Sequence, residues 1–224
     1  MSASPLLPQA FWFRLAIPCT RIDELPRKDA KRGLDLPESC RVPQTSLLDG
    51  REPWAEARVA WNPRGLAVEL IAQNDLGGLF RDDKPAGSYG FQLWVDTRDT
   101  RDVARATRFC HRFDGTLRAA PSRPRLLFVD LAQKPIARAI GEPPIAKRDA
   151  VQSWVELTRK GWKAGVFLSA EALSGFDADT NRRLGFCYRV ADPDLPDEVL
   201  GVSREFPIGE NPSLWSTLEL RGPA

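Results

Sequence analysis

The sequence predicts an all-β protein, built as a two-sheet antiparallel β-sandwich with very little helix. About ten short segments rich in β-branched and aromatic residues follow one another at regular spacing, which is typical of sandwiches. The 19 prolines and 16 glycines punctuate these segments and block long continuous helices. We see no internal repeat and no interdomain linker, so we expect a single domain over 1–224 that can bury a proper core.

The first predicted strand and the connection after it differ in composition. Residues 10–19 are aromatic and aliphatic, whereas residues from about 20–53 are rich in Pro, Arg, Asp and Gly and have little periodicity. We expect a long irregular connection there, with a short helical turn at 47–50. A stretch of this length is typical of a functional loop or of a segment that wraps over a sheet edge.

Three β-hairpins are predicted further along the chain, each with two strand-like runs around a loop or turn. Their strands are 57–62 with 66–73, 89–96 with 107–113, and 152–158 with 162–168. Further short strands are expected at 126–130, 136–140, 184–191 and 215–220, and irregular loops at 74–88 and 115–125. The only local helix signal is a single turn at 169–173, capped by Ser169 and stopped by Gly175.

The hairpin at 89–113 separates an apolar face from a polar face, because alternate side chains of a strand point to opposite sides. We expect Leu93 to lie opposite Phe109, which places Trp94 opposite Arg108. The polar face then carries four side chains with binding chemistry: Gln92, Trp94, Arg108 and Arg112.

Seven tryptophans against two tyrosines suggest flat aromatic faces of the kind that stack on sugars. Most of them are expected to fill the core. The candidates for exposed platforms are Trp94, Trp54 at the end of the long connection, and Trp154 on the polar side of its strand. For Trp94, a cation–π pair with Arg108 is the alternative.

The composition of the chain limits the kinds of binding partner and the cellular compartment that we expect. The formal net charge is only +2, so a nucleic-acid partner is not expected, and no apolar run is long enough to cross a membrane. No secretory signal is visible, which predicts a cytoplasmic protein, or an extracellular or periplasmic one if a leader has been trimmed. The four cysteines are expected to be free thiols, with a pair between Cys19 and Cys40 as the alternative in an oxidising compartment.

No catalytic residue is predicted. His111 is the only histidine, which excludes sites that need two imidazoles, and it falls on the apolar face of its strand. A carboxylate pair for glycoside hydrolysis remains open, but no spacing singles one out. We expect no cofactor, although a structural calcium at Asp96, Asp99 and Asp102 is an alternative to a salt-bridged loop with the intervening arginines.

Four segments resemble motifs of the family 9 carbohydrate-binding modules and the wider group of DOMON-like sandwiches. Gly90–Asp96 resembles a strand that ends in Asp, and 163–175 resembles a strand and turn in which Phe167-Leu168 replaces the usual Ile-Pro. Residues 185–192 resemble the family's "G-F-N-x-x-x-x-D" strand, and 215–220 its closing "W-x-x-L-x-L". The resemblance spans about 54–220 and consists of fold-level patterns.

The resemblance implies a jelly-roll-like or immunoglobulin-like sandwich in which tryptophans and polar side chains hold a sugar, and in which a structural calcium is sometimes present. We therefore predict a non-catalytic, carbohydrate-binding-like domain. Its glycan or other polar ligand would be held by Trp94, Trp54, Trp154, Gln92, Arg108 and Arg112. The alternative is an intracellular protein-interaction or structural domain that has lost sugar binding, followed by a glycoside hydrolase. The oligomeric state stays open.

Overall fold

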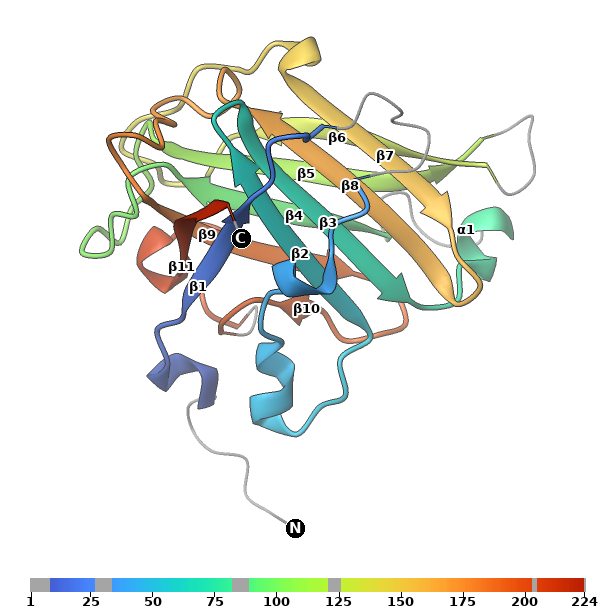
Figure 1. The fold of residues 1–224 in the computed structure, drawn as a ribbon. Coiled ribbons are helices and arrows are strands. Elements are labelled where there is room, and N and C mark those ends of the chain that lie inside the picture. The colour runs from blue at the N-terminus through green and yellow to red at the C-terminus, as the bar shows by residue number, and fades with distance from the viewer. Residues whose placement is uncertain (1–8, 27–33, 82–88, 121–125, 203–204, 224) are drawn as a thin grey trace.

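The regular secondary structure of the described residues is almost entirely β, as Figure 1 shows. The computed structural model describes residues 9–26, 34–81, 89–120, 126–202 and 205–223. The strands are β1 (Ala16–Arg21), β2 (Ala55–Asn62), β3 (Gly65–Gln73), β4 (Gly90–Asp96), β5 (Cys110–Ala119), β6 (Leu127–Lys134), β7 (Val151–Leu157), β8 (Gly161–Ser169), β9 (Arg183–Ala191), β10 (Glu198–Val199) and β11 (Ser216–Pro223). Within these ranges the only α-helix is α1 (Gly77–Arg81), and no helix is long and apolar enough to span a membrane.

Short 3-10 turns occupy parts of the connections. They are η1 (Gln9–Trp12), η3 (Glu38–Cys40), η4 (Thr45–Asp49), η5 (Arg148–Ala150) and η6 (Pro212–Leu214). The predicted helical turn near 47–50 is confirmed as η4, which ends at Gly50 in a left-handed conformation (φ 69°). That conformation suits glycine because glycine lacks a Cβ atom.

All strands belong to one continuous sheet that folds over on itself. The order is β6-β5-β4-β9-β11-β1-β2-β3-β8-β7, with β10 paired to β9, and the two end strands β6 and β7 contact each other. The rings of Phe91 in β4 and Trp162 in β8 stack at 6.5 Å, so the two halves of the sheet pack face to face. The all-β prediction is confirmed. The strands of the described residues form one sheet instead of the two that were predicted, and β1 runs parallel to both of its neighbours.

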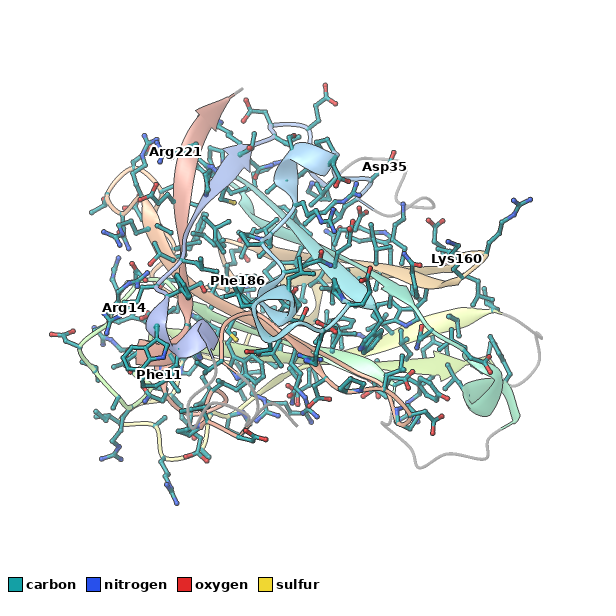
Figure 2. The ribbon with its side chains drawn as sticks, turned by 90° about the horizontal axis from the view of Figure 1, so that it is seen from below. Phe11, Arg14, Asp35, Lys160, Phe186 and Arg221 are labelled. Atoms are coloured by element: carbon teal, nitrogen blue, oxygen red, sulfur yellow. The ribbon has the colours of Figure 1, made fainter. Side chains whose placement is uncertain are left out.

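The main core lies between the two halves of this sheet, and Phe186, fully buried in it, is labelled in Figure 2. Phe11 lies at the periphery in the same view, and the neighbouring Trp12 is 71% exposed. Two smaller apolar clusters cover outer faces of the sheet. One surrounds Trp94 and is covered by residues 199–202 and 205–215, and the other is formed where residues 34–40 pack on β2, β3 and β8.

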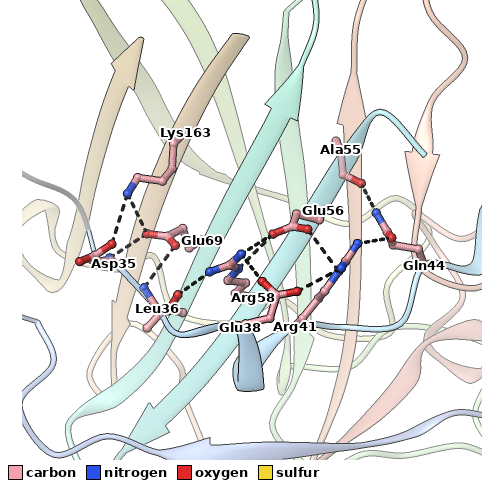
Figure 3. Close-up of polar contacts among 10 residues, drawn as sticks. All are labelled: Asp35, Leu36, Glu38, Arg41, Gln44, Ala55, Glu56, Arg58, Glu69 and Lys163. Atoms are coloured by element: carbon pink, nitrogen blue, oxygen red, sulfur yellow. Dashed lines mark hydrogen bonds and ion pairs between the residues drawn. The ribbon is translucent and has the colours of Figure 1, made fainter. Parts of the chain in front are cut away.

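The long connection therefore covers a face of the sheet. Glu69, buried in β3, fixes this segment by accepting hydrogen bonds from the backbone N–H groups of Asp35 (2.8 Å) and Leu36 (3.2 Å). Arg58 donates to the Leu36 carbonyl at 2.8 Å, and Lys163 lies 3.9 Å from Glu69 (Figure 3). Burial raises the pKa of Glu69, while Lys163 and the two N–H groups oppose that shift. These contacts make Glu69 the polar anchor of the covering segment.

Glu69→Gln is expected to lower the free energy of unfolding by about 1–2 kcal/mol. The amide keeps the size of the side chain but offers one acceptor oxygen to two N–H donors, so one buried donor loses its partner. Urea denaturation measures the change, with the exposed Glu171→Gln as the matched control. Equal stability of the two variants would contradict the anchoring role.

Several predicted boundaries move in the structure. Strand β1 begins at Ala16 instead of residue 10, because residues 9–12 form η1. The strand predicted at 126–130 is confirmed as the first part of β6, which continues to Gln133 and Lys134, both still paired with β5. The strand predicted at 136–140 is wrong, because residues 135–140 form no strand. The turn predicted at 133–135 is therefore absent, and residues after Pro135 leave the sheet.

Other predicted loops and turns are changed as well. The loop at 74–88 contains α1, with 82–88 outside the described residues, and β5 continues to Ala119 into the loop predicted at 115–125, of which 121–125 are not described. At 169–173 the N–H of Ala172 donates to Ser169 Oγ (3.4 Å) and Gly175 has φ 87°. The cap and the stop are therefore confirmed, although the residues form turns rather than a helix.

Candidate functional site

The central hairpin has the predicted faces but not the predicted pairing. Leu93 lies opposite Phe113, and Trp94 opposite Arg112, four residues further along than expected. The loop between β4 and β5 is longer than predicted, because the Asp96 carboxylate accepts hydrogen bonds from the backbone N–H groups of Arg98 (2.9 Å) and Thr100 (2.7 Å). A shift of four residues is even, so each side chain keeps its face.

The outer face of β5, β4 and β9 carries a row of three polar side chains. Gln92 in β4 lies directly between Asp114 in β5 and Arg189 in β9. Its Nε2 donates to Asp114 Oδ2 at 3.3 Å, and its Oε1 accepts from Arg189 Nη1 at 3.1 Å. The amide of Gln92 therefore joins an acidic and a basic side chain across three neighbouring strands.

Both ends of this row are held by further ion pairs. Arg112 donates from Nε and Nη2 to the two oxygens of Asp114, both at 2.8 Å. Arg189 donates from Nε to Asp197 Oδ2, also at 2.8 Å. Bidentate and charge-assisted pairs of this kind hold their geometry well. The result is a pre-arranged polar row from Arg112 to Asp197.

A hollow of about 670 Å³ lies over this row, and we call it the Gln92 hollow. Its floor includes Gln92, Asp114 and Arg189, and its walls come from the segments around Ser46 and Asp192. Gly90, two residues before Gln92 in β4, also lines the hollow. A Cβ atom at this position would lie 2.3 Å from the Gly115 carbonyl oxygen, so the close approach of β5 requires glycine here. The volume falls in the range of small-molecule sites.

Carboxylates outnumber cationic groups in this hollow. Among its described lining residues are five carboxylates, Asp49, Asp114, Asp192, Asp197 and Glu205, and two guanidinium groups, Arg51 and Arg189. Such a lining disfavours an anionic ligand because like charges would meet in a partly closed space. Hydroxyl-rich neutral molecules fit better, since each hydroxyl both donates and accepts hydrogen bonds.

A second, smaller hollow of about 430 Å³ lies beside Trp54, and we call it the Trp54 hollow. Arg41, Glu56 and Arg58 line it, and they form the ion pairs drawn in Figure 3. Trp54 is partly buried against the core, and its Nε1–H donates to the carbonyl of Pro196 at 2.7 Å. Pro196 lines the Gln92 hollow, so Trp54 stands between the two concave surfaces.

The structure does not bring the six predicted binding residues together. Gln92 lines the Gln92 hollow, and Arg112 lies one ion pair away from it. Trp54 lines the other hollow, and Trp154 packs against the outer cluster around Leu34. Arg108 is exposed on the loop after β4, with its guanidinium 5.0 Å from the ring of Phe109.

Trp94 was expected to offer an exposed face, and that expectation is wrong. The residue is only 2% exposed, because Ile208 and Trp215 pack on it within the segment that covers this side of the sheet. Its cation–π partner is Arg112, at 5.9 Å, instead of Arg108. Strand parity correctly separates the two faces of a sheet, but it does not reveal that a later segment covers one of them.

The acidic loop after β4 is tied into the fold. Asp99 accepts from the Thr217 hydroxyl (2.9 Å) and forms ion pairs with Arg101 (3.3 Å) and Arg183 (3.2 Å). The predicted salt-bridged arrangement is present at this residue. Within the described part of the chain, no group of three or more His, Cys, Asp or Glu side chains is arranged to hold a metal ion.

The remaining reactive groups are buried. His111 is fully buried, its Nε2 lies 3.2 Å from the Ser174 carbonyl oxygen, and burial lowers its pKa to about 4. This confirms the predicted core histidine. The four cysteines are buried free thiols, so no bond joins Cys19 to Cys40, and burial raises the pKa of the Cys187 thiol to about 12.

Sequence reasoning missed the other contributors to the Gln92 hollow. Gln92 lies between Asp114 and Arg189 on the neighbouring strands. The hollow is also lined by residues from distant parts of the chain, namely Ser46, Arg51 and Asp192. The signal for Arg189 was available, since it occupies a polar position in the strand predicted at 184–191. Its partner strand was not predictable, because β4 and β9 are separated by about 90 residues of chain.

No protein-family model matches the chain, and a search among curated proteins gives no match. Similar solved structures include a carbohydrate binding module family 9 from Caldicellulosiruptor kristjanssonii in complex with cellotriose, with 12% identity, a TM-score of 0.48 and 76% coverage of each chain. A complex of such a module from the same organism with glucose has 11% identity and a TM-score of 0.48, and the match covers 76% of this chain and 78% of that one. A candidate carbohydrate-binding protein from Bacteroides uniformis ATCC 8492 has 13% identity and a TM-score of 0.44, with 92% and 98% coverage.

Proposed function

We propose that this chain is a non-catalytic binding domain whose ligand is a neutral, hydroxyl-rich molecule such as a glycan, held in the Gln92 hollow. The observation that carries the proposal is the polar row on the floor of the hollow. There an amide joins an Arg and an Asp whose other partners hold them in place.

The row offers donors and acceptors side by side. Gln92 uses one N–H and its oxygen within the row, so its second N–H remains for a ligand. Carboxylate oxygens accept more than one hydrogen bond, which leaves capacity at Asp114 as well. Neighbouring hydroxyl groups of a sugar have this same mixture of donor and acceptor. Apolar contact in this hollow would come from Leu195 and Pro196 rather than from a tryptophan face.

Gln92→Ala is expected to weaken glycan binding by roughly tenfold or more, because the variant loses direct contacts and loosens both flanking ion pairs. A glycan array measures this with the wild type and the variant side by side. Gln152→Ala is the matched control, since Gln152 is an exposed strand residue outside the hollow. Binding that is equal in the wild type and Gln92→Ala would place the ligand elsewhere, and no binding by the wild type would reject the proposal.

A further inference from the structure

Arg189 presents a fixed and unused hydrogen-bond donor to the Gln92 hollow. Its Nε donates to Asp197 Oδ2 at 2.8 Å, and its Nη1 donates to Gln92 Oε1 at 3.1 Å. Its third nitrogen, Nη2, has no hydrogen-bond partner among the described residues, and it does not belong to the fully covered polar atoms that lack one. Since Arg189 lines the hollow and its side chain is 28% exposed, a ligand can reach this nitrogen.

The guanidinium group of Arg189 is held on two sides. Because a guanidinium is planar, fixing Nε and Nη1 also fixes the directions in which Nη2 donates. The side chain of Asp197 is only 9% exposed, so its ion pair with Arg189 is largely shielded from solvent. A donor that is already in place binds a ligand at a lower entropic cost.

The same contacts fix the direction of the Gln92 amide. A guanidinium can only donate hydrogen bonds, and an ionised carboxylate can only accept them. The amide oxygen must therefore face Arg189 and the amide nitrogen must face Asp114, as the structure has them. Arg112 holds Asp114 in place through two bonds of 2.8 Å. The second N–H of Gln92 consequently lies at the Asp114 end of the row.

Donors and acceptors therefore alternate along the row. From one end to the other, Asp114 accepts, the Gln92 nitrogen donates, the Gln92 oxygen accepts, Arg189 donates and Asp197 accepts. Carboxylate oxygens accept more than one hydrogen bond, so both aspartates keep capacity while they are paired. A hydroxyl group, which donates and accepts at once, fits beside a neighbouring donor and acceptor at either end of the row. An ammonium group could not accept from Arg189, and a carboxylate would meet an aspartate at either end.

We propose that Arg189 contacts the ligand directly, and that the floor of the Gln92 hollow selects a sugar with two hydroxyl groups that bind at the two ends of the row. One hydroxyl accepts from the Gln92 N–H and donates to Asp114. The other accepts from Arg189 Nη2 and donates to Asp197. The inference rests on the proposed function for the place of the ligand, and it adds a contacting residue and a requirement for two hydroxyl groups.

NMR titrations with D-glucose, D-galactose, D-mannose and D-xylose, and then with the mono-O-methyl derivatives of the strongest binder, test the two hydroxyl contacts. A methyl ether keeps its acceptor oxygen but has no proton to donate. Methylation at either bound position is therefore expected to weaken binding by roughly tenfold, because a hydrogen bond to a carboxylate is lost.

Arg189→Lys keeps the charge, but an ammonium group has no planar fork that holds two partners and presents a third nitrogen in a fixed direction. This variant is expected to bind the parent sugar roughly tenfold more weakly than the wild type does. It is also expected to lose the discrimination against one of the two methylated sugars, since the corresponding hydroxyl is no longer bound. Arg148→Lys is the matched control, because Arg148 is an exposed arginine in η5 outside the lining of the hollow.

Dispersed amide spectra establish that each variant is folded. Equal binding by the wild type and Arg189→Lys would overturn the Arg189 contact, and so would a variant that binds every sugar more weakly but keeps both methyl penalties. In either case, weaker binding by Gln92→Ala would leave the proposed function standing. Loss of one methyl penalty in Arg189→Lys with wild-type binding by Gln92→Ala would support the Arg189 contact and contradict the proposed function. No binding of the four sugars by the wild type would overturn the two hydroxyl contacts, while the glycan array tests the proposed function separately.

Discussion

Replacing Trp94 with alanine is expected to lower the free energy of unfolding by about 3–5 kcal/mol, the usual loss for a large buried aromatic side chain. The indole is 2% exposed and packs against Ile208 and Trp215. Its removal would leave a cavity between the sheet and the segment that covers it. Urea denaturation of the wild type and the variant measures the change.

Trp12→Ala is the matched control for this prediction. Trp12 is 71% exposed, so its loss is expected to change stability by less than about 0.5 kcal/mol. A similar small effect for Trp94→Ala would mean that the covering segment does not pack on Trp94. Since the variant acts on stability, it is also a poor probe of ligand binding at this face.

Acid is expected to destabilise the fold through His111. Burial lowers the pKa of His111 to about 4, against about 6.5 in an unfolded chain, so the unfolded state binds a proton first as the pH falls. The stability from the neutral imidazole is fully present above about pH 6.5 and is lost progressively toward pH 4. The expected loss from this group is about 3 kcal/mol.

His111→Gln removes this titration and keeps a donor for the Ser174 carbonyl. His111 is the only histidine, and the carboxylates titrate alike in both proteins. The difference in unfolding free energy between wild type and variant, followed from pH 7 to pH 4, therefore isolates the imidazole. A difference that stays constant over this range would show that His111 is not held neutral by burial.

Local periodicity predicted the strands well where both faces have a clear character. The hairpins at β2–β3 and β7–β8 are confirmed nearly to the residue, because tight turns at Gly65 and Gly161 fix their register. The hairpin β4–β5 kept its faces but not its register. Its long loop is set by the hydrogen bonds of Asp96, which no alternation pattern can reveal.

Contacts between distant segments limited the prediction of the site. Gln92 was identified from its position on the polar face of one strand, but Arg189, Ser46 and Asp192 come near it only through the folded-over sheet. The covering of Trp94 by residues 199–202 and 205–215 has the same origin, since these residues follow Trp94 by more than 100 positions. Burial by distant segments of the chain decides which face of the sheet stays exposed, and periodicity does not report it.

Titration calorimetry with a glycan selected by the array shows whether the ligand binds in the Gln92 hollow. The comparison is between Gln92→Ala and Gln73→Ala, because Gln73 lines the neighbouring Trp54 hollow with the same type of side chain. We predict that Gln92→Ala weakens binding by roughly tenfold or more and that Gln73→Ala leaves it unchanged. Loss of binding in Gln73→Ala with wild-type affinity in Gln92→Ala would contradict binding in the Gln92 hollow and place the ligand beside Trp54.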